Sequence, residues 1–100
     1  MDHSVSKIIR NHISEQEVID LLAKLVSFPS HEGIVHQETE TAEYICSFFR
    51  EEGIEAELVP VEDGRCNLIA TLRGTGGGKT LLLTGHTDTV PPYDMSGKPY

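Results

Sequence analysis

The spacing of apolar and polar residues predicts an amphipathic helix early in the chain. Ser14 and Glu17 have the spacing of a capping box, in which the two side chains satisfy backbone N–H groups at a helix start. Apolar residues then recur at helical intervals up to Pro29, whose ring disfavours helical geometry at the preceding residue. We therefore expect a first helix over about residues 14–27.

A second apolar stripe predicts another helix over about residues 36–52. Gly53 follows it at the position where a residue in the left-handed conformation commonly ends a helix. The residues of the stripe are Ala42, Ile45, Cys46 and Phe49. The polar stretch between the two helices is expected to be a connecting loop.

The pattern changes to that of strands after Gly53. Residues 54–58 alternate apolar and acidic side chains, which is typical of a strand with one solvated face. Asp63 and Gly64 predict a turn, in a connection longer than a tight two-residue hairpin. Residues 67–72 form a second predicted strand. Residues 80–84 form a third, and because they lack alternation we expect this strand to be buried on both faces.

The order helix, helix, strand, strand, strand predicts an α/β fold whose sheet is incomplete in this chain. The most buried predicted strand comes last, and ligands bind at the ends of such strands in α/β sheets. We interpret residues 14–100 as the front part of a larger α/β domain and residues 1–13 as an N-terminal segment.

Composition and charge narrow the possible partners. The chain of 100 residues carries a formal net charge of −8, which argues against nucleic-acid and anionic-membrane partners because both favour basic surfaces. Cys46 and Cys66 lack the spacing of a metal or redox motif, and two buried thiols in a reducing compartment are the simplest interpretation, although a disulfide stays possible. The N-terminus lacks the apolar run of a signal peptide, so we expect a cytoplasmic protein.

Two stretches resemble functional motifs, but each lacks a feature that its motif requires. RGTGGGKT, residues 73–80, has Arg73 where a phosphate-binding loop needs its first glycine, and Lys79 leads into apolar residues with no sign of a helix start. HEGIVH separates His31 and His36 by five positions, so they cannot share a metal as histidines four apart on a helix do. We therefore interpret residues 73–80 as a flexible connection between strands and residues 31–36 as a polar loop.

LLLTGHTDTVPP, residues 81–92, carries the strongest chemical signal. Side chains two apart in a strand project to the same side, so His86 and Asp88 are expected to lie together at the strand end. An imidazole can bind zinc through one nitrogen while its other nitrogen donates to a carboxylate that fixes the ring. Pro91 and Pro92 then stop the strand. For a bare H-x-D, a hydrogen-bonded pair with no further role is the preferred interpretation, since a zinc site needs three or four ligands.

Read as a whole, LLLTGHTDTVPP resembles the first metal-binding motif of the M20 zinc metallopeptidases. This family includes acetylornithine deacetylase, succinyl-diaminopimelate desuccinylase, aminoacylase and carboxypeptidase-like members. The resemblance extends over nearly all of the chain from Ser14, because the helix ending in SFPS, a second helix and the NLIA strand occur in the family's order. It implies the N-terminal portion of the zinc-dependent exopeptidase catalytic domain, without the family's dimerisation domain. The absence of a tryptophan shortly after the Val-Pro pair departs from many members and leaves the subgroup open.

The resemblance also implies an activity and two site residues. His86 would ligate one zinc of a two-zinc centre, and Asp88 would be the family's catalytic, active-site aspartate oriented toward His86. The general base and the other ligands have no matching position before Tyr100. The implied function is metal-dependent amide hydrolysis of an acylated amino acid or peptide in a complete protein, with a possible homodimer, while these 100 residues alone are expected to be inactive. Cobalt or manganese could replace zinc at a mixed histidine and carboxylate site.

Two other functions stay open at this point. One is a non-catalytic binding or structural fragment of the fold, which metal stoichiometry would distinguish from a metal enzyme. The other is a nucleotide-binding module built on RGTGGGKT, which would require a nucleotide signal that disappears in Lys79→Ala.

Overall fold

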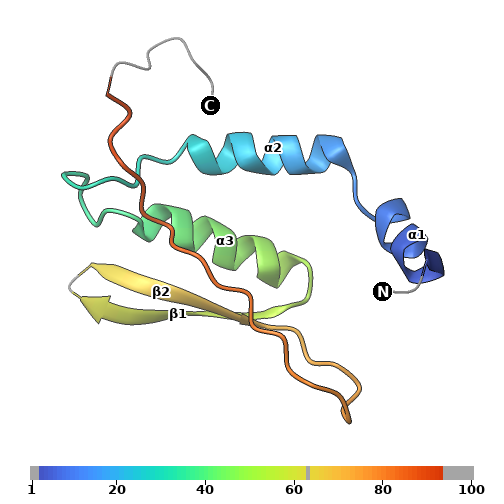
Figure 1. Ribbon diagram of the computed structural model, residues 1–100. Coiled ribbons are helices and arrows are strands. Elements are labelled where there is room, and N and C mark those ends of the chain that lie inside the picture. Colours follow the sequence, from blue (N-terminus) through green and yellow to red (C-terminus); the bar gives the residue numbers. More distant parts are fainter. Residues whose placement is uncertain (1–2, 63, 94–100) are drawn as a thin grey trace. The chain divides into compact units, whose positions relative to one another are not determined.

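The computed structural model describes residues 3–62 and 64–93, and within them the chain forms helices and one small sheet (Figure 1). The elements are α1 (His3–Asn11), α2 (Glu15–Val26), α3 (Thr39–Glu51), β1 (Glu55–Glu62) and β2 (Arg65–Thr71). The described residues divide into two compact units, residues 3–27 and residues 28–93 without 63, and each is considered by itself.

The first unit contains α1 and α2. Ser14 caps α2 as predicted, because its hydroxyl oxygen accepts a hydrogen bond of 3.2 Å from the Glu17 backbone N–H. The expected helix over residues 14–27 is therefore confirmed to within one residue at each end. Helix α1 was not predicted, although its three apolar residues have helical spacing: Val5, Ile8 and Ile9. None of the residues of these two helices is buried.

Helix α3 begins at Thr39, three residues later than predicted. The difference has a backbone cause, because His36 and Gln37 have positive φ angles of 59° and 41° and cannot belong to a right-handed helix. The helix end agrees with the prediction. Gly53 has a φ of 77°, and its N–H and that of Ile54 bond to carbonyls of the last turn in the Schellman pattern.

Strands β1 and β2 form an antiparallel hairpin. Glu62 pairs with Arg65, so only two residues connect the strands and the expected longer connection is wrong. The predicted turn residue Asp63 lies outside the described residues, whereas Gly64 has the positive φ of 73° that the turn requires. A Cβ at Gly64 would also meet the ring of His36.

The core of the second unit lies between α3 and one face of the hairpin, and α3 runs beside both strands (Figure 1). Its most buried apolar residues are Ala42 and Cys46 from α3 and Ala56 from β1, with 1%, 2% and 7% of their surface exposed. The acidic residues that alternate with Ala56 are exposed, so the prediction of a strand with one solvated face is confirmed. Cys66 is only half-buried, which corrects the expectation of two buried thiols, and both cysteines are free.

The expected third strand is absent from the described part of the chain. Residues 80–84 form no ladder, and Leu81, Leu82 and Leu83 are 80%, 81% and 83% exposed. An apolar run becomes a buried strand only when neighbours supply both ladder hydrogen bonds and covering side chains. The described residues supply neither around this run, so the fold is a mixed helix and strand fragment with a two-stranded sheet.

Candidate functional site

The predicted site residues lie on the segment that follows β2. His86 and Asp88 belong to an extended stretch without regular secondary structure, and their side chains are 83% and 49% exposed. The segment is held to the rest of the unit just after Asp88. The Thr89 N–H donates to the Ser30 carbonyl oxygen at 3.3 Å, and Thr89 forms an isolated parallel bridge with His31.

The contact between His86 and Asp88 is direct. Nδ1 of His86 lies 2.7 Å from the backbone carbonyl oxygen of Asp88 and 3.0 Å from its carboxylate oxygen Oδ1. Both oxygens can only accept, so the neutral tautomer that these contacts suit is the one with its proton on Nδ1, which donates to Asp88. Nε2 is then the unprotonated nitrogen and has the lone pair that a metal ligand needs.

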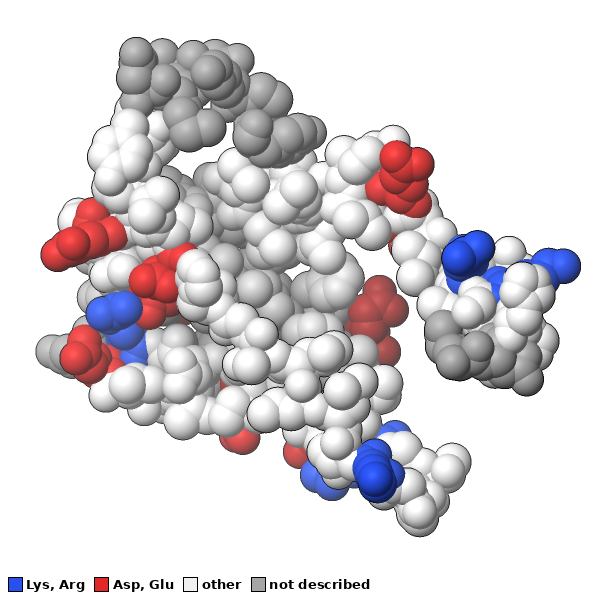
Figure 2. Space-filling view, in the orientation of Figure 1, with Lys and Arg blue, Asp and Glu red and all other residues white. Residues whose placement is uncertain are grey.

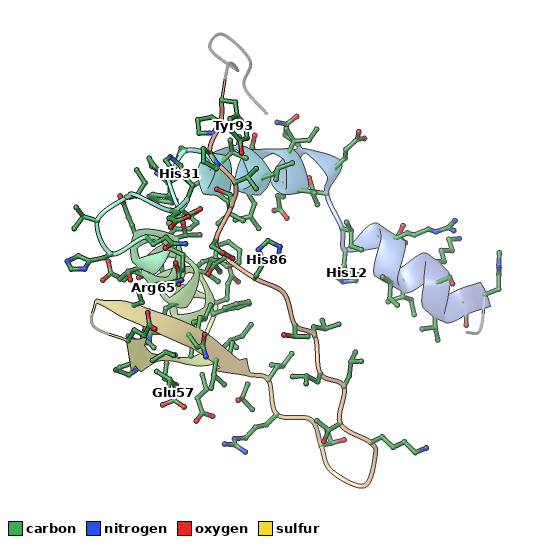
Figure 3. All side chains as sticks on the ribbon, turned by 60° about the vertical axis from the view of Figure 1, so that its left-hand side comes forward. His12, His31, Glu57, Arg65, His86 and Tyr93 are labelled. Atoms are coloured by element: carbon green, nitrogen blue, oxygen red, sulfur yellow. The ribbon has the colours of Figure 1, made fainter. Side chains whose placement is uncertain are left out.

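A groove of about 550 Å³ runs between β2 and the segment that carries His86. Its lining combines apolar residues of both segments with four side chains that can carry charge: Glu38, Arg65, His86 and Asp88. Figure 3 shows Arg65 where β2 begins, beside α3, and His86 on the neighbouring segment. The groove therefore brings the predicted pair together with two charged residues that the sequence did not single out.

Glu38 and Arg65 form an ion pair at the side of this groove. Nε of Arg65 donates to Oε1 of Glu38 at 3.0 Å, and a terminal guanidinium nitrogen lies 3.0 Å from the same oxygen. The hydrogen bond with Glu38 is the main cause that raises the pKa of Arg65 above its ordinary value, although desolvation opposes it. The nearby charges of Glu38, Glu62 and Asp88 raise this pKa further. Figure 2 shows acidic side chains bordering basic ones on this face of the molecule.

Sequence reasoning missed this pair for a clear reason. Glu38 and Arg65 are 27 positions apart, and each is one of many charged residues in the chain. Only the two-residue hairpin connection and the delayed start of α3 bring them together. The N-terminal side of α3 is fixed to the hairpin by a second contact, in which the Thr39 hydroxyl donates to the Gly64 carbonyl.

The two motif-like stretches do not form the sites that their patterns suggest. In the described residues from Lys79 to Tyr93 the chain forms no helix, so the helical backbone N–H groups that hold phosphates in a phosphate-binding loop are missing there. His31 and His36 lie in a turn region rather than on a helix, and Nδ1 of His31 contacts the Glu32 carbonyl oxygen at 2.9 Å. Across residues 3–62 and 64–93, no three histidine, cysteine or acidic side chains come close enough to hold a metal ion.

None of the described helices is both long enough and apolar enough to cross a bilayer.

Comparison with known proteins finds enzymes that remove acyl groups from amino acids. The chain is 42% identical over 80 residues to acetylornithine deacetylase of Photorhabdus laumondii, a match that covers 73% of this chain and 20% of the relative. It is 34% identical over 77 residues to succinyl-diaminopimelate desuccinylase of Wolbachia pipientis, covering 77% and 18%. A shorter match to acetylornithine deacetylase of Aliivibrio salmonicida has 55% identity over 43 residues, covering 43% and 11%.

These curated relatives are members of the M20 family, which confirms the resemblance seen in the sequence. The chain spans about a fifth of the length of the relatives it matches. No family model matches the chain, and no solved structure matches it.

Proposed function

This chain is related to the M20 metallopeptidases, and from that premise we propose that the whole protein hydrolyses an amide bond in a small acylated amino acid or peptide. The named relatives remove acetyl and succinyl groups from amino acids, which supports this reaction class. In this proposal the chain forms the N-terminal part of the catalytic domain and begins a two-zinc site.

The observation that carries the proposal is the orientation of the His86 ring. Its Nδ1 faces two acceptor oxygens of Asp88, so in the tautomer that donates to them Nε2 is the nitrogen that would ligate a metal. This is the arrangement in which a carboxylate fixes the tautomer of a zinc-binding histidine and raises its basicity as a ligand. The donors present therefore suit zinc, with cobalt or manganese as alternatives. A bound zinc would lower the pKa of a coordinated water and polarise the amide carbonyl.

The two residues would have different parts in this reaction. His86 would hold the metal, and Asp88 would keep the proton on Nδ1 and the ring in place. Their high exposure leaves the pair open to substrate, while the apolar side chains of the groove would exclude water once further residues covered them.

The 100 residues alone are proposed to be inactive. A catalytic zinc site requires three protein ligands and an open position, whereas the described residues bring no three candidate ligands together. In this short chain His86 should therefore bind zinc weakly. Tight stoichiometric zinc binding or hydrolysis by these 100 residues would contradict the proposal.

The decisive experiment uses the complete protein and separates the two roles. His86→Ala should lose bound zinc, measured by elemental analysis after dialysis. Asp88→Ala should keep most of its zinc and lose about 10- to 100-fold in kcat/KM on N-acetyl and N-succinyl amino acids. His12→Ala and Asp20→Ala are matched controls, because both residues are exposed and belong to the other unit, His12 just after α1 and Asp20 on α2, and they should change neither quantity. Full activity in Asp88→Ala would refute its assigned role.

A further inference from the structure

The segment that carries the candidate site is joined to residues 28–31, which lie between α2 and α3 in sequence. The contacts are made by two residues that are 59 positions apart, Ser30 and Thr89. The Thr89 N–H donates to the Ser30 carbonyl oxygen at 3.3 Å, and the hydroxyl oxygens of the two residues lie 3.4 Å apart, where either can donate to the other. A parallel bridge between His31 and Thr89 adds to this junction. Backbone and side chain therefore join the two segments at the residue that directly follows Asp88.

Ser30 is the buried side of this junction. It is 3% exposed, whereas Thr89 lies on the surface. Two residues before Ser30, the ring of Phe28 contacts the ring of Tyr44 on α3, with 5.3 Å between the ring centroids. Pro29 lies between Phe28 and Ser30 and restricts the backbone there. Ser30 is thus tied to the helix that packs against the hairpin.

The buried hydroxyl of Ser30 contributes little to stability by itself. A hydroxyl that is taken out of water needs a hydrogen bond in compensation, and at 3.4 Å the one between Ser30 and Thr89 is long. Alanine would fill the same space without that cost. Because Thr89 is exposed, its own hydroxyl could bond to water instead. What the pair of hydroxyls adds is a fixed position for Thr89.

The segment before Thr89 has little other support. Residues 80–88 form no ladder, the leucines among them are exposed, and the His86 side chain is 83% exposed. The contact of 3.0 Å between His86 and Asp88 joins two residues of this segment to each other and not to the rest of the unit. Thr89 is the next residue after Asp88, so an anchor at Thr89 limits where both side chains can lie.

We propose that Ser30 is a positioning residue that anchors Thr89 and thereby holds His86 and Asp88 at the groove beside β2. The inference rests on the proposed function for its purpose, because the residues of a metal site must be held within about half an ångström of their productive positions. The anchor consists of atoms of this chain alone, so it can also be tested without metal or substrate.

The first test uses the complete protein and compares variants on both sides of the junction. Thr89→Val keeps the shape of the side chain and removes its hydroxyl, whereas Thr89→Ser keeps the hydroxyl. Thr89→Val and Ser30→Ala should each lower kcat on N-acetyl amino acids roughly two- to fivefold, the effect of one lost hydrogen bond, with KM and zinc content unchanged. Thr89→Ser should keep most of the kcat. The double variant Ser30→Ala/Thr89→Val should lose no more than either single variant, because both changes remove the same bond.

Ser27→Ala is the matched control. Ser27 is the other serine of SFPS, and its hydroxyl donates to the Lys24 carbonyl oxygen in the last turn of α2. This variant should leave kcat unchanged. Losses that multiply in the double variant, or an equal loss in Thr89→Ser and Thr89→Val, would overturn the proposal.

The second test uses this chain without metal or substrate. Amide hydrogen exchange measured by NMR reports how often the bond from the Thr89 N–H to Ser30 opens. Ser30→Ala should speed exchange of the Thr89 amide roughly two- to fivefold and leave that of Cys46, within α3, unchanged. A Thr89 amide that exchanges at the same rate in Ser30→Ala, or that is unprotected in the parent chain, would refute the anchor. Because this measurement involves no hydrolysis, its failure is distinguishable from failure of the proposed enzyme activity.

Discussion

The β1–β2 hairpin and the segment of residues 80–93 are both rich in apolar residues, yet only the hairpin forms regular structure. In the hairpin, each strand has its partner only two residues away in sequence, and α3 comes directly before β1. Both the ladder hydrogen bonds and the core contacts therefore join elements that are neighbours in sequence. The apolar run of the other segment is more continuous than that of either strand, yet more than three-quarters of the surface of each of its leucines is exposed: Leu81, Leu82 and Leu83. Apolar content alone does not make a strand, because a strand also needs an edge to pair with.

The largest expected difference in stability between the packed part of this unit and the leucine segment comes from introducing a charged side chain into each. Ala42→Asp would bury a carboxylate at a position that is 1% exposed, and we expect it to destabilise the second unit by about 3–5 kcal/mol. Leu81→Asp, at a position 80% exposed, should change the free energy of unfolding by less than about 0.5 kcal/mol. Urea denaturation followed by circular dichroism measures both. Equal losses would show that the leucine segment is packed in solution.

The same contrast explains how much could be predicted from the sequence. Three confirmed predictions depend only on neighbours within a few residues. They are the cap at Ser14, the cap at Gly53 and the alternation around Ala56. The third strand depends on distant partners, and there the prediction is wrong. The start of α3 was missed because nothing in the residue types of His36 and Gln37 announces their positive φ angles.

In the candidate site, too, a contact between sequence neighbours was predicted and a contact between distant residues was not. The two-residue spacing of His86 and Asp88 indicated that their side chains would lie together, and the structure has them 3.0 Å apart. Their roles in metal binding and catalysis remain predictions. Glu38 and Arg65 could not be predicted, because their contact depends on the hairpin register and on where α3 starts.

A smaller difference in the free energy of unfolding is expected between two glycines, one just before the hairpin and one in the connection that precedes the leucine segment. Gly53 and Gly76 both have positive φ angles, 77° and 93°, and a Cβ at either position would meet no other atom within 4 Å. Gly53→Ala should cost about 1–2 kcal/mol, since the hydrogen-bonded cap fixes the left-handed conformation. Gly76→Ala should cost less, because the glycine-rich connection is free to adopt another conformation. Chemical denaturation of both variants measures the difference, and equal costs would mean that the connection is as constrained as the cap.

The smallest expected effect concerns the exposed ion pair between Glu55 and Arg73, which links β1 to the residue two positions beyond the end of β2. These side chains are 64% and 76% exposed, so the gain from their attraction is largely offset by solvent screening and by the cost of ordering two long side chains. Arg73→Gln should therefore lower the free energy of unfolding by less than about 0.5 kcal/mol, and high salt should abolish even that difference. Urea denaturation at low and high salt measures it. A loss well above this value would mean that the pair holds the end of the hairpin closed, and that order in the hairpin extends further toward the leucine segment than the ladder itself.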